Sequence, residues 1–122
     1  MSKRELTGRT RYNVLNYGLF GTQRAVVLQV EERWNEQINN GNEVRFEPIL
    51  AWRNAQPLDL FENPRLEKGR KHRLMNYGFP LKNKSAYVLQ VERVEEDMNF
   101  MLYTVMRDAL PADAVVMLMD ER

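Results

Sequence analysis

Residues 25–31 of this chain read AVVLQVE, and residues 86–92 read AYVLQVE. Six of the seven positions are identical in the two stretches. Apolar side chains recur at every second position, and β-branched and aromatic residues are frequent, which is the pattern of a half-buried β-strand. We therefore predict a β-strand at each of the two sites.

An Asn-Tyr-Gly motif stands ahead of each predicted strand, at residues 16–18 and 76–78. Glycine adopts positive φ angles without steric cost, and asparagine tolerates them better than most residues. The motif therefore indicates the end of one strand and the start of a loop. We predict a β-hairpin in each half of the chain, with loops near residues 19–23 and 79–85.

The same order of motifs in both halves indicates an internal duplication. A weaker echo follows in the same order, because residues 53–59 read RNAQPLD and residues 107–113 read RDALPAD. We predict two diverged copies, at about 9–61 and 69–122, joined by a proline-containing, charged connection at about 56–71. A unit of about 60 residues buries little surface when it is alone. We therefore expect the two copies to pack together.

The predicted fold is a single domain of residues 1–122 that is mainly β, with two tandem β-meander repeats forming one barrel or sandwich. Residues 44–52 alternate and predict a third strand, in which Pro48 indicates an edge or a bulge. The last third supports two alternatives. A helix at 95–109, with acids in its first turn, would give an α+β fold with that helix packed on an antiparallel sheet. A strand there would repeat the first copy, and residues 114–119 predict a closing strand.

The composition excludes several classes of protein. The 122 residues include no cysteine, which excludes disulfide scaffolds, thiol catalysis and cysteine-type metal sites. No apolar stretch follows the polar N-terminal residues, so no secretory signal is predicted. No apolar run approaches the roughly 20 residues that a membrane helix needs. We therefore expect a cytoplasmic protein without membrane contact.

Few residues offer catalytic chemistry. The only histidine, His72, lies among cationic neighbours in GRKHR at residues 69–73, which disfavours its protonated form. Gly18 and Gly21 lack the strand–helix context and the lysine of a phosphate-binding loop. The acids at 95–97 are adjacent and do not converge on one cation. We predict no catalytic, cofactor-binding or metal-binding residue and no small-molecule substrate, and therefore a protein that is not an enzyme.

Charge is distributed unevenly along the chain, although its formal net value is only +1. Residues 65–84 carry seven basic side chains and one acid, a net charge of +6. Residues 92–122 carry eight acids and three bases, a net charge of −5. Two segments of opposite sign indicate either patches that pair with each other or a basic surface for a polyanion.

There are two hypotheses for the function of this chain. The alternative hypothesis follows from the basic surface and is a single-stranded nucleic-acid-binding module. Such modules stack bases on exposed aromatic rings beside a basic groove. The candidate ligand-binding residues are Arg9, Arg11, Tyr17, Arg70, Lys71, His72, Arg73, Tyr77, Lys82 and Lys84. The other interpretation of Tyr17 and Tyr77 is that their rings pack at the hairpin ends.

The main hypothesis is a non-enzymatic binding protein that acts through a protein partner or by self-association as a homo-oligomer. Five methionines lie late in the chain, and their flexible thioether side chains suit either core packing or an adaptable interface. The candidate interface residues are Met98, Met101, Met106, Met117 and Met119. The absence of a catalytic set favours this hypothesis over an enzyme.

Overall fold

The computed structural model describes residues 3–78 and 84–114 of the chain. Its elements, in chain order, are β1 (Glu5–Tyr17), the 3₁₀ turn η1 (Leu19–Gly21), β2 (Gln23–Asn40), β3 (Glu43–Asn54), helix α1 (Pro57–Glu62), the 3₁₀ turn η2 (Pro64–Glu67), β4 (Lys71–Tyr77), β5 (Lys84–Glu96) and β6 (Leu102–Asp108). Residues 111–114 are helical. The prediction of a mainly β fold is confirmed.

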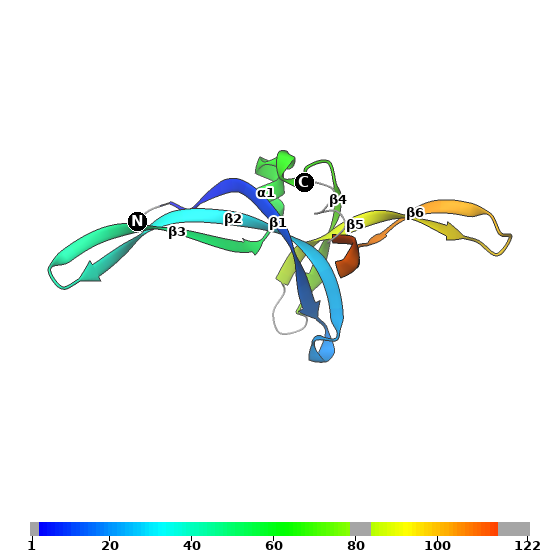
Figure 1. Cartoon of the computed structure of the whole chain (residues 1–122), viewed down its shortest axis with the longest axis horizontal. Helices are drawn as coiled ribbons and strands as arrows, with labels where there is room; N and C mark the ends of the chain where they lie inside the picture. Colours follow the sequence, from blue (N-terminus) through cyan, green and yellow to red (C-terminus); the bar gives the residue numbers. More distant parts are fainter. Residues whose placement is uncertain (1–2, 79–83, 115–122) are drawn as a thin grey trace.

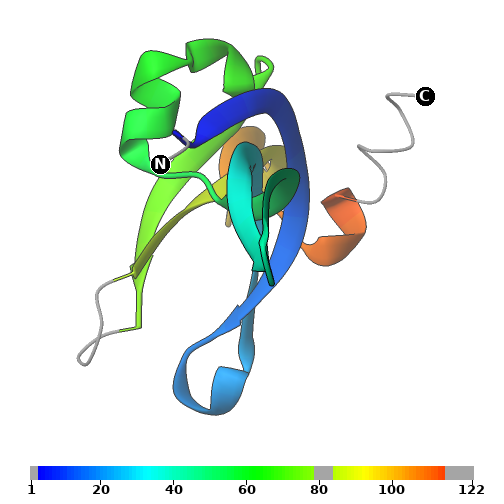
Figure 2. The same cartoon turned by 90° about the vertical axis from the view of Figure 1, so that its left-hand side faces the viewer.

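All strands belong to one antiparallel, six-stranded sheet. The central path runs β1-β2-β5-β4, while β3 pairs with β2 and β6 pairs with β5. The two halves meet where Val27 of β2 faces Val88 of β5. The sheet curls into an open half-barrel rather than a closed barrel or a sandwich (Figure 2).

The strands at this crossing carry the core because both faces of the sheet are covered there. Val26, Val27, Leu28 and Val30 of β2 are buried, as are Val88 and Leu89 of β5. Side chains of this size contribute about 1.5–3 kcal/mol each when they are fully buried. The apolar character of both AVVLQVE-like stretches therefore places the core of the sheet at its centre.

Three apolar clusters surround the crossing. One lies on the face of Val27 and Val88 and includes Met75, with Leu15, Tyr17 and Tyr77 packed against it. A second groups Leu28 with Leu60 and Leu66 from the segment after β3, and Tyr87 of the other half packs against it. A third groups Val26 with Leu89, Ala109 and Ala114, and Tyr12 packs against it. Each half thus completes the core of the other.

Several backbone bonds recur in the two halves. The Leu28 carbonyl accepts a hydrogen bond from Ala55 N at 3.0 Å, and the Leu89 carbonyl accepts one from Ala109 N at 2.8 Å. The carboxylates of Asp59 and Asp113 each accept a bond from the backbone N three residues earlier, at 2.7 Å in both cases. These recurring bonds are what two related sequences would form, while duplication of the sequence stays a prediction.

The alternative of a helix at 95–109 is wrong. Residues up to Glu96 belong to β5, and Leu102–Asp108 form β6, which pairs with β5 in continuous register. Of the acids expected to start a helix, Glu95 and Glu96 end β5 and Asp97 forms the turn, because its carboxylate accepts bonds from Asn99 N at 2.8 Å and Met101 N at 2.9 Å. Pairing with β5 provides hydrogen-bond partners for backbone N–H and C=O groups that would otherwise have bonded within a helix.

The segment between the halves is more ordered than the connection predicted at 56–71. It contains α1 and η2, and it buries Leu60 and Leu66 beneath the sheet. Pro57 at the first helical turn and the Asp59 carboxylate, which accepts a bond from Gln56 N, start α1. The closing strand predicted at 114–119 begins in a helical turn at Ala114, and its remainder lies outside the described residues.

Candidate protein interaction surface

Two long ribbons leave the centre of the sheet in opposite directions (Figure 1). In the first half, β1 pairs with β2 only as far as Arg33, so residues 34–49 form a two-stranded first arm of β2 and β3. In the second half, β4 pairs with β5 only as far as Gln90, so residues 91–107 form a two-stranded second arm of β5 and β6. Two-stranded ribbons are marginally stable in water unless something packs against them.

The first arm exposes a row of apolar side chains on β3. Val44, Phe46 and Leu50 lie at alternate positions, so they point to the same face of the ribbon, and Pro48 lies between them. The Phe46 side chain is 65% exposed, and Val44 and Leu50 are exposed to a similar extent. The row therefore offers a partner a continuous apolar strip.

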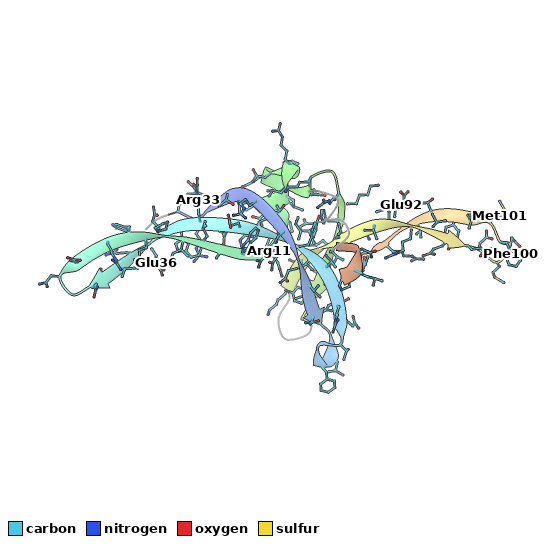
Figure 3. All side chains as sticks on the ribbon, viewed as in Figure 1. Arg11, Arg33, Glu36, Glu92, Phe100 and Met101 are labelled. Atoms are coloured by element: carbon cyan, nitrogen blue, oxygen red, sulfur yellow. The ribbon has the colours of Figure 1, made fainter. Side chains whose placement is uncertain are left out.

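The second arm exposes apolar side chains along its length and at its tip. Val94 of β5 and Leu102 of β6 are exposed on one face, since Val94 pairs with Thr104 and Glu96 with Leu102. At the turn, Met98 is 97% exposed and Phe100 is 81% exposed. Figure 3 shows Phe100 and Met101 at the end of this arm.

The apolar residues of the two arms belong to the same face of the sheet. The register of β2 with β3 places Phe46 opposite Gln37, on the face that Val27 shares. The pairing of Val27 with Val88 carries this face to Val94, three alternations further along β5. In the register of the sheet, the covered central cluster around Val27 and Val88 lies between the exposed apolar residues of the two arms.

Both arms are acidic. Residues 34–49 carry three acids and one base, and residues 91–107 carry four acids and two bases, so each has a net charge of −2. In the second arm, hydrogen bonds from Arg107 and Tyr103 lower the pKa of Glu95 to about 2. The net negative charge of each arm disfavours contact with a polyanion.

The structure places the predicted nucleic-acid residues of the first half within internal contacts. Arg9 reaches Glu31, with 3.5 Å between Nη1 and Oε2. The Arg11 guanidinium donates to Gln29 at 2.7 Å and lies 4.6 Å from the centre of the Trp52 ring. These arginines cover β2 and β3 of their own chain.

The tyrosines of the two Asn-Tyr-Gly motifs, Tyr17 and Tyr77, pack at the ends of the hairpins. Tyr17 and Tyr77 are half-buried and pack against the cluster formed around Val27 and Val88. The Tyr77 hydroxyl accepts a hydrogen bond from the Asn54 side chain at 3.3 Å. Their rings therefore contribute to the packing at the centre of the fold, while a role in stacking on bases stays a prediction.

His72 and Arg70 contact Tyr12 of the other half. The His72 imidazole is stacked on the Tyr12 ring, its Nε2 lies 2.8 Å from the Tyr12 hydroxyl and its Nδ1 lies 3.3 Å from a Glu67 oxygen. Burial lowers the pKa of His72, although Glu67 opposes the shift. The Arg70 guanidinium lies over the Tyr12 ring, 5.5 Å from the ring centre. The group is a structural bridge between β1 and β4.

The remaining candidate ligand-binding and interface residues fall into three groups: one forms an ion pair, several lie at the surface or are half-buried, and the others lie outside the described residues. Arg73 donates to Asp108, with 2.7 Å between Nε and Oδ1, so the basic strand β4 is tied to the acidic strand β6. Lys71 and Lys84 are exposed. Lys82 lies outside the described residues, as do Met117 and Met119. Of the candidate interface methionines, Met98 and Met101 are exposed at the tip of the second arm, and Met106 is half-buried on β6.

Neither the apolar strip of the first arm nor the exposed Phe100 was predicted from the sequence. A signal was present, because Val44 and Phe46 alternate with the charged residues Arg45 and Glu47 on a strand whose proline indicates an edge. The alternation distinguishes an apolar face of the strand from a polar face. It does not show whether another part of the protein covers the apolar face. Only the length of β2 beyond β1 leaves it open.

Within the residues that the structure describes, no group of three or more acidic or histidine side chains is placed to hold a metal ion. The helices of the same residues are all too short or too polar to cross a membrane. Comparisons with protein-family models, with curated proteins and with solved structures find no match to this chain.

Proposed function

We propose that this chain is a non-enzymatic interaction protein that binds another protein, or a second copy of itself, through its two arms. The observation that carries the proposal is the row of exposed apolar side chains on ribbons that have only two strands. Such ribbons gain stability when a further surface packs against them. Contiguous exposed apolar patches are typical of protein interaction sites.

The charges favour a protein partner over a nucleic acid. Each arm has a net charge of −2, whereas binding to nucleic acid needs several free cations facing the phosphates. Arg9, Arg11 and Arg73 are held by side chains of their own chain, and the rings of Tyr17 and Tyr77 pack in the core. The absence of cysteine fits a reducing compartment, so we place this interaction in the cytoplasm.

Four exposed phenylalanines allow a matched test by light scattering. Phe46 and Phe100 lie on the arms, while Phe20 and Phe61 are exposed elsewhere, at 91% and 84%. If the chain self-associates through its arms, the variant Phe46→Asp/Phe100→Asp has a lower mass in solution than wild type. The control variant Phe20→Asp/Phe61→Asp keeps the wild-type mass.

The alternative results of this experiment are equally informative. A lower mass for the control variant, with no change for the arm variant, would exclude the arms as the self-association surface. A wild-type chain that is strictly monomeric would leave a different protein as the partner, and cross-linking from the arms then decides whether one binds there. A monomer without an arm-specific cross-link would contradict the proposal.

A further inference from the structure

We propose that the outer edge of β5 at residues 91–96 binds an extended, arginine-bearing segment of another polypeptide, which adds a strand beside β5. This inference rests on the proposed function and deepens it, because it names the place and the chemistry of the partner. It concerns the edge of the second arm, where backbone groups face outward, and not the apolar row on its face.

The edge is open because β4 is short. β4 pairs with β5 from Lys84 to Gln90 and begins at Lys71, where the chain arrives from η2. β6 occupies the opposite edge of β5 from Gln90 to Glu96. Within residues 3–78 and 84–114, no strand pairs with the outer edge of β5 beyond Gln90. An unpaired edge of this kind accepts an added strand through main-chain hydrogen bonds.

The first half of the molecule has a strand at the corresponding place. After an irregularity between Leu6 and Thr10, β1 continues along β2 until Glu5 pairs with Arg33. This extension covers Glu31, whose side chain accepts a bond from Thr7 Oγ1 at 2.9 Å and lies 3.5 Å from the Arg9 guanidinium. Glu31 is consequently only 4% exposed.

In the second half, the position that corresponds to Glu31 is exposed among the described residues. Equal steps from the pairing of Val27 with Val88 lead to Glu31 on β2 and to Glu92 on β5. Glu31 pairs with Trp52, which Arg9 and Arg11 cover, and Glu92 pairs with Met106. Glu92 is exposed and makes no ion pair or side-chain hydrogen bond within the part of the chain that the structure describes.

The charge of this edge selects a basic strand. Glu92, Val94 and Glu96 are exposed on one face of β5, so two carboxylates flank an apolar side chain. Glu95 points to the other face, where Arg107 already neutralises it. A partner strand with arginines on the matching face would pair with both free carboxylates, as Arg9 does with Glu31.

A second copy of the same edge fits poorly. If residues 91–96 paired antiparallel with themselves in full register, Glu92 would lie opposite Glu95 of the other copy. Directly opposed like charges destabilise a strand pair. The outer edge of β3 is also less suitable, because Pro48 interrupts its row of backbone donors. In full register, the edge of β5 therefore fits a basic strand of another polypeptide better than a copy of itself.

The test uses a peptide with the sequence of residues 4–12, RELTGRTRY, because this segment already forms such a strand on β2. It is titrated into the full-length protein while backbone amide chemical shifts are recorded. We expect shifts in β5 at residues 91–96, and an affinity that falls about tenfold in Glu92→Lys, the equivalent of about 1.4 kcal/mol. The control Glu36→Lys, an exposed glutamate on the first arm, keeps the wild-type affinity.

A second peptide, in which the three arginines of RELTGRTRY are replaced by glutamates, tests whether the binding depends on charge pairing. We expect it to bind Glu92→Lys better than it binds wild type. The inference is overturned if RELTGRTRY does not bind, if Glu92→Lys binds it as well as Glu36→Lys does, or if the shifts lie on β2 instead of β5. If any of these results occurs while substitutions at Phe46 and Phe100 still change the mass or the cross-links, the proposed function stands and only the edge inference falls.

Discussion

His72 is the only histidine in the chain, and its side chain is fully buried against Tyr12 of the other half. Burial lowers its pKa, so the folded chain binds a proton less readily than the unfolded chain does. Stability is therefore fully present above the ordinary histidine pKa of about 6.5 and falls as the pH drops through that value.

We predict that the melting temperature falls between pH 7.5 and pH 5.5, and that His72→Gln flattens this dependence because the titrating group is gone. Differential scanning calorimetry at both pH values measures it. An unchanged slope in the variant would show that another group titrates in this range. His72→Gln is also expected to lower the stability at pH 7.5, since the stacking on Tyr12 is lost.

At this scale the sequence predicted the buried residues better than the contacts. Alternation in the two AVVLQVE-like stretches identified strands whose apolar residues are buried at the crossing. The contacts of Tyr12 with His72, and of Arg11 with Trp52, join residues that are 60 and 41 positions apart. A local sequence pattern does not predict contacts between residues so far apart. Arg11 and His72 were therefore interpreted as parts of a basic surface.

The turn of the second arm depends on one carboxylate. Asp97 accepts two backbone hydrogen bonds, and Phe100 holds the left-handed conformation at φ 63°. We predict that Asp97→Ala destabilises the arm by about 1–2 kcal/mol, because both bonds are lost. The loss appears as faster amide hydrogen exchange in β6, by about tenfold, while the amides of Val27 and Val88 exchange as in wild type. Equal acceleration in both places would mean that the arm and the centre open together.

At the scale of elements, the strands were predictable and the helices were not. Strands were expected at 25–31 and 44–52, within β2 and β3, and ahead of the loop near 19–23, where β1 lies. The residues of α1 and η2 were interpreted as an irregular connection. Two prolines and a glycine in this segment masked a six-residue helix, because Pro57 favours a first helical turn as well as a loop. The choice between helix and strand at 95–109 was decided by pairing with β5, a tertiary effect that local propensity does not contain.

The two halves are expected to unfold as one unit. The cluster of Leu28 receives Tyr87 from the second half, and the cluster of Leu89 receives Tyr12 from the first. We predict that Leu28→Ala and Leu89→Ala each cost about 2–5 kcal/mol of unfolding free energy, within a single shared transition. Urea titrations followed by tryptophan fluorescence and by circular dichroism measure this, since both tryptophans, Trp34 and Trp52, lie in the first half. Two separated transitions would mean that each half folds alone.

The whole molecule is not expected to bind single-stranded nucleic acid. Both arms are acidic, and Arg9 and Arg73 form ion pairs with carboxylates of their own chain, which reduces the positive charge offered to phosphates. We predict that a labelled single-stranded oligonucleotide shows no rise in anisotropy at about 50 mM salt, where such binding is strongest. Binding that collapses at about 200 mM salt, and that Tyr17→Ala or Tyr77→Ala weakens, would restore the alternative hypothesis.

The shape of the molecule was the least predictable property. The sequence indicated related hairpins and a mainly β sheet, but strand propensity does not tell how far a strand continues beyond its neighbour. β2 extends past β1, and β5 extends past β4, and these two differences in length create the arms. The exposed apolar residues follow from them, which is why Met98 and Met101 were identified by composition alone and Phe46 was missed.

The most direct test of the arms as interaction surfaces places a photo-cross-linking phenylalanine analogue at each of four exposed phenylalanines in turn. The sites are Phe46 and Phe100 on the arms, and Phe20 and Phe61 elsewhere. In cells that produce the protein, we expect a discrete cross-linked species from the two arm sites and none from the other two. Cross-links from Phe20 or Phe61 alone, or none from any site, would contradict the role proposed for the arms.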